Sequence, residues 1–142
     1  MGKLIKSHLA RLISLSAASY QAIAALYGFL WPKVFWDFTT KSMDSAVSPI
    51  PYLQLANFVS AGAVMAWEWP IHSCAQLRFY VYPQAHAVIF LVAAVPASLL
   101  YQGTNAALYY IIAAAFYWWS CYEGEIISPQ PWRCTEEESS WA

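Results

Sequence analysis

Long runs of apolar residues are the main feature of the sequence. Four of these runs, at residues 9–30, 52–69, 79–100 and 105–122, reach the roughly 17 to 25 residues that a helix needs to cross a membrane. None alternates apolar and polar residues as the strands of a transmembrane barrel do. Because backbone polar groups in lipid must be satisfied within the protein, helices remain. The pattern predicts an all-α, four-span (tetraspan) membrane bundle that forms one domain over residues 1–142.

A shorter amphipathic segment, WPKVFWDFTTK, follows the first run. Trp31 and Phe35 recur at helical spacing on one side, and Trp36 adds a third ring nearby. Asp37 lies on the opposite, charged side. This pattern is typical of a short helix on the membrane surface. The rings are explained by an aromatic belt at the interface, and a docking surface for a partner is the sharper alternative.

Composition agrees with a membrane protein. The chain has 142 residues, of which 60% are hydrophobic and 11% charged, about half the charge of ordinary soluble domains. Its net charge is −1 and its seven basic residues are scattered. No basic stripe exists that could follow a phosphate backbone, so nucleic-acid binding is excluded.

The basic residues also predict an orientation. With four spans, both termini lie on one side of the membrane, together with the loop at residues 70–78. This side holds most of the basic residues: Lys3, Lys6, Arg11, Arg78 and Arg133. Because basic residues concentrate in cytoplasmic loops, both termini are predicted to be cytoplasmic. The thiols of Cys74, Cys121 and Cys134 fall on this reducing side. Cys74 and Cys121 lie near enough to the membrane for palmitoylation, and residues 128–142 read as a disordered tail.

The segment AWEWP places Glu68 at the cytoplasmic end of the second span. Arg78 opens the third span, and Glu123 and Glu125 close the fourth at the same level. Since partly desolvated charges are costly unless paired, we expect Arg78 to bridge Glu68 and Glu123. Alternatively, the carboxylates that Arg78 leaves unpaired bind a basic segment of a partner protein. The candidates for this network or for partner contact are Glu68, Trp67, Trp69, Arg78, Glu123, Glu125, Trp31, Phe35, Trp36 and Asp37.

Inside the spans, small residues recur every fourth position and predict close helix contacts. They are Ser14, Ala18 and Ala22, Ala24 with Gly28, Ala56 with Ser60, and Ala93 with Ala97. His86 lies about 12 Å into the predicted third span, where a histidine is a functional hypothesis. His8 and His72 lie too near the surface to be its partner in a bis-histidine haem. We expect His86 to be a neutral imidazole that bonds to Gln, Asn or Ser.

Motifs of catalysis are missing from the sequence. It has no Ser/His/Asp order, no HExxH, no phosphate-binding glycine loop, no dinucleotide fingerprint and no paired metal-ligand spacing. The sequence therefore predicts a protein that is not an enzyme, with no cofactor, no metal and no small-molecule substrate. A small-molecule or proton pathway through Gln21, Asn57, Gln84 and His86 is a competing hypothesis.

Several longer segments of the sequence resemble those of a known family. MGKLIKSHLARLISLSAASYQ, GFLWPKVFWDFTTKSMDSAVSPIP, AWEWP, YQGTNAALYY and EGEIISPQPW together resemble the NoxD-type small four-span endoplasmic-reticulum membrane proteins of filamentous fungi. The resemblance implies a non-catalytic adaptor of a fungal NADPH oxidase complex, similar in role to the small membrane subunit of the phagocyte oxidase. It implies the catalytic oxidase subunit as partner, and superoxide signalling in cell fusion and development as context. A structural reticulum tetraspan without an oxidase partner is the alternative.

Overall fold

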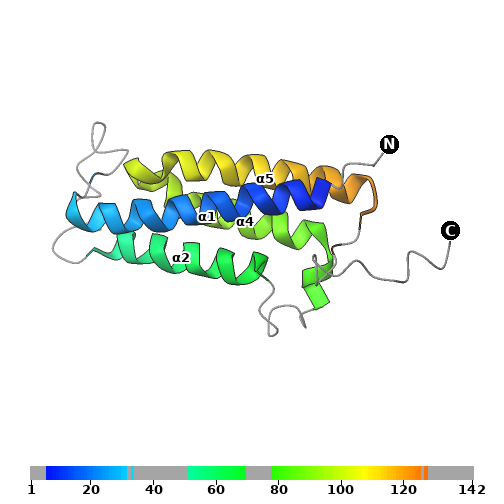
Figure 1. The fold of residues 1–142 in the computed structure, drawn as a ribbon, viewed down its shortest axis with the longest axis horizontal. Coiled ribbons are helices and arrows are strands. Elements are labelled where there is room, and N and C mark those ends of the chain that lie inside the picture. The colour runs from blue at the N-terminus through cyan, green and yellow to red at the C-terminus, as the bar shows by residue number, and fades with distance from the viewer. Residues whose placement is uncertain (1–5, 32, 34–50, 70–77, 126, 128–142) are drawn as a thin grey trace.

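Helices account for nearly all of the described part of the chain. The computed structural model describes residues 6–31, 33, 51–69, 78–125 and 127. The long helices are α1 (Lys6–Leu30), α2 (Tyr52–Glu68), α4 (Pro83–Leu99) and α5 (Thr104–Tyr122), and the 3-10 turns are η2 (Arg78–Val81) and η3 (Tyr101–Gly103) (Figure 1). The described residues contain no β-strand, so the predicted all-α class is confirmed. The predicted surface helix after Trp31 and the predicted tail lie outside the described residues.

The helix boundaries follow the predicted spans closely, with one difference. α4 begins at Pro83, whereas the apolar run begins at Phe79. Proline disfavours helical geometry in the residue before it but suits the first turn of a helix. Tyr82 accordingly has an extended backbone, with φ −91° and ψ 120°. The start of the third run is therefore a separate 3-10 turn, η2, rather than the first turn of α4.

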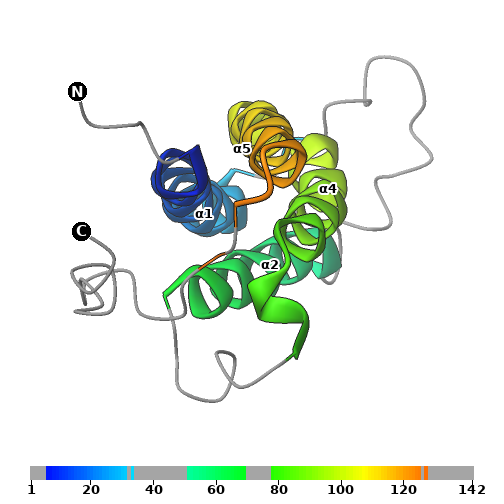
Figure 2. The ribbon, with the colours of Figure 1, turned by 90° about the vertical axis from the view of Figure 1, so that its right-hand side faces the viewer.

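The four helices run alongside one another in alternating directions (Figure 1). Seen end-on, they form a ring in the order α1, α2, α4 and α5 (Figure 2), in which each helix packs against its neighbours in the chain and α5 closes the ring onto α1. This topology brings the start of α1, the end of α2, the start of α4 and the end of α5 to one end of the bundle. We call it the charged end, because Lys6, Arg11, Glu68, Glu123 and Glu125 lie there.

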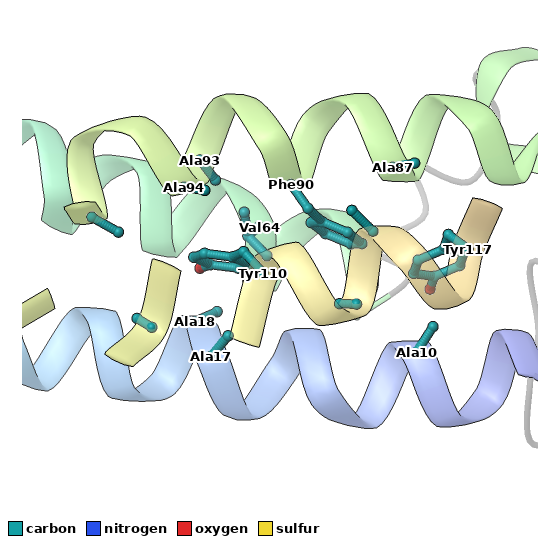
Figure 3. Close-up of a cluster of buried hydrophobic side chains, with 14 of the residues drawn as sticks. Ala10, Ala17, Ala18, Val64, Ala87, Phe90, Ala93, Ala94, Tyr110 and Tyr117 are labelled. Atoms are coloured by element: carbon teal, nitrogen blue, oxygen red, sulfur yellow. The ribbon is translucent and has the colours of Figure 1, made fainter. Parts of the chain in front are cut away.

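Small side chains line the contacts between helices. The buried alanines of the core are Ala10, Ala17, Ala18, Ala87, Ala93, Ala94, Ala97, Ala106, Ala107, Ala113 and Ala114. Phe90, Tyr110 and Tyr117 fill the space that remains between the backbones (Figure 3). Small residues let helix backbones approach closely, which is how helices associate where no hydrophobic effect separates protein from solvent.

Most of the predicted small-residue faces lie at these contacts. Ser14 and Ala18 on α1 are buried, as are Ala93 and Ala97 on α4. Gly28 is also buried, and a Cβ added there would lie 3.2 Å from Cγ of Gln54 on α2. The predicted face of Ala56 and Ser60 is only half correct, because Ser60 contacts Gln21 of α1 whereas Ala56 is exposed.

The bundle exposes large apolar side chains and also buries several polar ones. Large apolar side chains cover the outside, including Ile23 (67% exposed), Leu30 (80%) and Val92 (66%). The fully buried residues include Gln21 and Glu68, two types that soluble proteins mostly expose. The outer surface of the bundle is therefore apolar along the helices.

By length and composition, α1 is the one helix in the described part of the chain that could cross a membrane. α4 is apolar but shorter, with 17 residues. The three further crossings that the sequence predicts therefore stay predictions.

Candidate functional site

The last residue of α2, Glu68, is the centre of a buried polar cluster at the charged end. α2 ends there because Pro70 follows and disfavours helical geometry at Trp69. Trp69 has φ −82° and ψ 104°, an extended backbone. The Glu68 side chain meanwhile remains on the inner face of the helix and has no exposed surface. The AWEWP segment thus turns the carboxylate inward and lets the next tryptophan turn outward.

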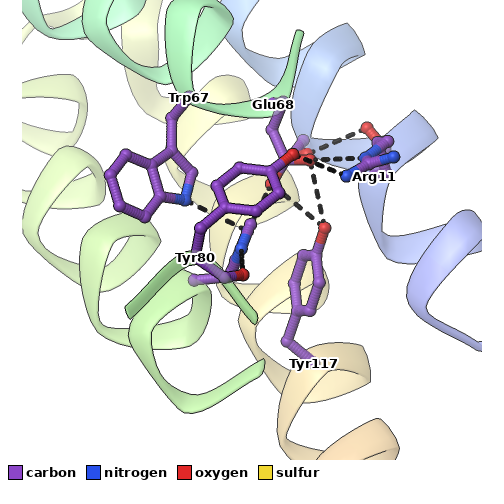
Figure 4. Close-up of polar contacts among 7 residues, drawn as sticks. Arg11, Trp67, Glu68, Tyr80 and Tyr117 are labelled. Atoms are coloured by element: carbon purple, nitrogen blue, oxygen red, sulfur yellow. Dashed lines mark hydrogen bonds and ion pairs between the residues drawn. The ribbon is translucent and has the colours of Figure 1, made fainter. Parts of the chain in front are cut away.

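Three side chains from three other helices surround the Glu68 carboxylate (Figure 4). Nε of Arg11, on α1, donates to Oε2 at 3.1 Å. The hydroxyl of Tyr117, on α5, lies 3.0 Å from Oε1 and 3.1 Å from Oε2. Nδ1 of His86, on α4, lies 3.0 Å from Oε1. One carboxylate therefore joins all four helices of the bundle.

His86 is fully buried and enclosed by aromatic rings. Its ring stacks on Tyr117 with centroids 4.9 Å apart, and it makes T-shaped contacts with Tyr80 and Trp67, with centroids 5.1 and 5.6 Å apart. Nε2 lies 2.9 Å from the backbone carbonyl oxygen of Tyr80. The indole N–H of Trp67 donates toward Nδ1 at 3.2 Å. The expectation that His86 bonds to Gln, Asn or Ser is wrong, because its partners are Glu68, Trp67 and Tyr80.

Arg11 brings a permanent positive charge into the interior. Arg11 is 7% exposed. In addition to its bond to Glu68, it donates a hydrogen bond from Nη2 to the hydroxyl of Tyr80 at 2.8 Å. A buried ion pair adds little net stability compared with apolar residues, but removal of one partner costs about 3–5 kcal/mol because the other charge is left uncompensated. Glu68 and Arg11 therefore depend on each other.

A second carboxylate ties the end of α5 to the start of α1. Gly124 has φ +73° and ends α5 in a Schellman motif, with Gly124 N–H bonded to Cys121 O and Glu125 N–H to Ser120 O, each at 3.0 Å. This turn aims the Glu125 carboxylate at the first backbone N–H groups of α1: Ser7 N lies 3.2 Å from Oε2 and Lys6 N 3.4 Å from Oε1. A negative charge at this position also complements the helix dipole.

Hydrogen bonds set the ionisation of Glu125. Burial by itself raises the pKa of its carboxyl, but bonds from the Ser120 hydroxyl and from the backbone N–H groups of Ser7 and Lys6 outweigh burial. The pKa therefore lies below the ordinary value of 4.5. Beside it, Lys6 forms an ion pair with Glu123 and lies 3.9 Å above the ring of Trp119. The charged end is thus closed by contacts between α1 and α5.

A second polar layer lies deeper in the bundle, around Gln21. Its Nε2 donates to Asn57 Oδ1 and to Ser60 Oγ, both at 2.9 Å, and its Oε1 accepts the hydroxyl of Tyr110 at 2.7 Å. Asn57 in turn donates to the carbonyl oxygen of Pro96 at 2.9 Å, one of the last carbonyls of α4. Hydrogen bonds of this kind contribute about 0.5–1.5 kcal/mol each to stability.

The residues proposed for a polar pathway do not form one in the described part of the chain. Gln84 is exposed and bonds to the thiol of Cys121 at 3.1 Å. Phe90 lies between the His86 layer and the Gln21 layer, with ring centroids 6.2 Å from His86 and 6.1 Å from Tyr110. Polar groups at the two levels are therefore separated by an aromatic side chain.

The sequence-predicted residues fall into separate groups. Glu68 and Trp67 meet at His86, whereas Glu123 and Glu125 lie with Lys6 instead. Arg11, which the sequence did not suggest, pairs with Glu68. The predicted contact of Arg78 with Glu68 is untested, because the side chain of Arg78 lies outside the described residues. Trp69 and Trp31 are about equally exposed, at 62% and 63%, at opposite ends of the bundle. Three further candidates, Phe35, Trp36 and Asp37, lie outside the described residues.

Sequence reasoning missed Arg11, Tyr80 and Tyr117 as members of the cluster. One signal for Arg11 was available, because the buried residues of α1 recur in a seven-residue pattern that places it on the inner face. They are Ser7, Ala10, Arg11, Ser14, Ala17, Ala18, Gln21, Ala24, Ala25 and Gly28. An arginine within this stripe of small and polar residues cannot face outward, so it requires an internal acid.

The cluster holds one guanidinium, one carboxylate and one imidazole away from solvent, an arrangement suited to fixing helices or holding a proton. No group of three or more His, Cys, Asp or Glu in the described ranges is placed to bind a metal ion. A protein-family model described as a domain of unknown function (DUF7727) matches residues 1–125. No curated protein and no solved structure matches the chain.

Proposed function

The chain belongs to the DUF7727 family, and we propose that it is a four-span membrane adaptor of a fungal NADPH oxidase. In this proposal it is not catalytic and supports the folding, trafficking or activity of the oxidase's catalytic membrane subunit. It is embedded in the endoplasmic-reticulum membrane with both termini in the cytoplasm. The oxidase and the reticulum rest on the resemblance of the sequence motifs, AWEWP among them.

The observation that carries the membrane part of the proposal is an apolar outer surface around a bundle that buries charged and polar groups. Apolar side chains such as Leu12, Leu91 and Leu108 are exposed on three different helices, while a carboxylate, a guanidinium and an imidazole are buried together. A soluble helix bundle would leave this outer surface in water, where exposed apolar patches drive association. In lipid the same surface needs no partner, and ionisable groups face the bundle interior.

By length and composition α1 meets the test for a membrane span, and the proposal adds three shorter crossings. α2 and α4 have 17 residues each and α5 has 19, so these three would cross at the short end of the range of about 17–25 residues for a spanning helix. Aromatic residues gather near both ends of the bundle, with Trp31, Tyr52 and Tyr101 at one end and Trp69, Trp118 and Trp119 at the other. Rings at these positions are typical of the two interfaces of a membrane.

The adaptor role follows from what such a protein can offer. The four long helices contain more than half of the residues of the chain, so in a four-span arrangement much of the surface available to a partner lies within the bilayer or at its rims. Association must then be largely lateral, through helix faces and interfacial side chains. Within AWEWP, Glu68 is buried and positions α2, whereas Trp69 is exposed at the rim. We therefore propose Trp69 as the contact residue of this motif.

Topology is the first test. A tag on each terminus, probed by protease in sealed microsomes and again after permeabilisation, is expected to show both ends on the cytoplasmic side. Termini on opposite sides would refute the four-span arrangement.

Co-purification from fungal membranes in mild detergent tests the partner. We expect the catalytic oxidase subunit to be recovered with the wild-type protein and at least several-fold less with Trp69→Ala, at an unchanged level of the adaptor. Trp118→Ala is the matched control, because Trp118 is 63% exposed and Trp69 is 62% exposed. Recovery of no oxidase subunit with the wild-type protein would refute the adaptor role and favour a structural tetraspan.

A further inference from the structure

The two ring nitrogens of His86 face more acceptors than a neutral imidazole can serve. Nε2 lies 2.9 Å from the carbonyl oxygen of Tyr80, which can only accept a hydrogen bond. Nδ1 lies 3.0 Å from Oε1 of Glu68, which as a carboxylate also only accepts. A neutral imidazole carries one N–H and one bare nitrogen. One of these two short contacts would then join two lone pairs.

Neither neutral tautomer removes the conflict. With the proton on Nε2, the bond to Tyr80 is made and Nδ1 can accept the indole N–H of Trp67, but bare Nδ1 then faces the Glu68 carboxylate. With the proton on Nδ1, the bond to Glu68 is made, but bare Nε2 faces the Tyr80 carbonyl. One additional proton between His86 and Glu68 resolves both contacts at once.

We infer that His86 and Glu68 form a proton-binding site, which holds one proton more than a neutral imidazole and a carboxylate would carry. The proton lies between Nδ1 of His86 and Oε1 of Glu68. Nε2–H remains bonded to Tyr80 O. The ligand of this site is therefore a proton, and the site is a property of the folded bundle because its atoms come from α2, α4 and η2.

The surroundings offset the positive charge that the proton adds. Within the described residues, the titratable and charged groups that face the pair are Arg11 from α1, Tyr80 from η2 and Tyr117 from α5. Tyr80 accepts from both cationic groups, through its hydroxyl from Arg11 at 2.8 Å and through its carbonyl from His86 at 2.9 Å.

The ring of Tyr117 stabilises the same charge, because His86 stacks on its face. Ring faces attract cations, more strongly where water is excluded. The Trp67 N–H contact, at 3.2 Å the longest of those made by the His86 nitrogens, is the one that gives way when Nδ1 carries a proton.

The bound proton has a structural consequence. It converts the contact of α4 with the end of α2 from a repulsion between lone pairs into a hydrogen bond, and through Nε2–H it holds η2 against α4. Loss of the proton would weaken the packing at the charged end of the bundle, where Trp67 and Trp69 flank Glu68.

The test reads the protonation state directly in the full-length protein. Of the three histidines in the chain, His8 and His72 are replaced by Gln, so that His86 is the remaining imidazole. In lipid nanodiscs at neutral pH, ¹⁵N NMR reports whether each ring nitrogen carries a proton, and isotope-edited infrared spectroscopy reports whether a glutamic acid is protonated. We expect either both nitrogens of His86 to be protonated or a carboxylic-acid band that Glu68→Gln removes. A neutral His86 beside an ionised Glu68 would overturn the inference.

Glu68→Gln supplies the matched control. Its side chain keeps the shape of Glu68, and its amide N–H can donate to bare Nδ1, so no additional proton is needed. We expect His86 to be neutral in this variant, with the proton on Nε2. A doubly protonated His86 in Glu68→Gln would show that Glu68 does not hold the proton and would likewise overturn the site. The spectra of the protein with Glu68 intact decide the question even where this variant fails to fold. Neither measurement depends on an oxidase partner.

Discussion

Replacement of Glu68 by leucine tests the buried cluster most directly. The substitution keeps an apolar side chain at the end of α2 but removes the acceptor of Arg11, His86 and Tyr117. Arg11 is 7% exposed, so its guanidinium is left in the interior without a counter-charge. We expect the free energy of unfolding to fall by about 3–5 kcal/mol, the usual cost of breaking a buried ion pair.

A second substitution in the same protein shows whether the charge is the cause. With Arg11→Met added, no buried charge is left uncompensated, and His86 can donate to Tyr80 O while accepting from the Trp67 indole. The Tyr117 hydroxyl still lacks its acceptor, which costs about 1–3 kcal/mol. The double variant is therefore expected to be more stable than Glu68→Leu alone, by about 2 kcal/mol.

The assay is reversible unfolding in mixed micelles with increasing denaturing detergent, followed by circular dichroism. Glu123→Leu is the matched control, because its carboxylate pairs with Lys6 where the side chains are 28% and 15% exposed. That pair is expected to contribute about 0–1 kcal/mol. A loss for Glu68→Leu no larger than that for Glu123→Leu, or a double variant less stable than Glu68→Leu, would refute the reasoning.

Three further substitutions probe other contacts by the same unfolding assay. Gln21→Leu removes the centre of the deeper polar layer and should cost about 1–3 kcal/mol; an unchanged midpoint would contradict the role of that layer. Gly103→Ala should cost about 1–3 kcal/mol, because the new Cβ would lie 2.6 Å from the carbonyl oxygen of Ala97, whereas Gly62→Ala meets nothing within 4 Å and should be neutral or stabilising. Glu125→Gln should lower stability above the ordinary carboxyl pKa of 4.5, since a depressed native pKa stabilises the folded state only where the carboxyl is ionised. The difference from the wild-type protein should then shrink below that value and disappear as the pH falls through the lower pKa of the folded protein, and a difference that persists in stronger acid would argue against the charge.

The apolar runs predicted the helices because length and hydrophobic pattern act locally. Each run contains enough helix-compatible residues for a long helix, and prolines mark two of the boundaries. Pro70 ends α2 by its effect on Trp69, and Pro83 starts α4 in its first turn. α4 begins later than the apolar run that predicted it because of the same local effect of proline. The apolar residues before Pro83 made the predicted helix too long.

The partner of Glu68 could not be found in the same way. Arg78 was the nearest basic residue in the sequence at the right depth, whereas Arg11 lies 57 residues away from Glu68. The choice depends on which helices are neighbours in the ring and on how each is rotated about its axis. α1 packs against both α2 and α5 with its Arg11 face inward, and this arrangement brings the guanidinium to the carboxylate.

By itself the sequence determined that the chain is all-α, approximately where each helix begins and ends, and that its charges gather toward one end. These properties follow from backbone hydrogen bonding within segments and from the sorting of polar and apolar residues. Only the tertiary structure decided that Glu68, Arg11, His86 and Tyr117 share one buried cluster. Hydrogen bonds and ion pairs act over a few ångströms, so the partners of a buried charge are set by helix packing rather than by distance along the chain.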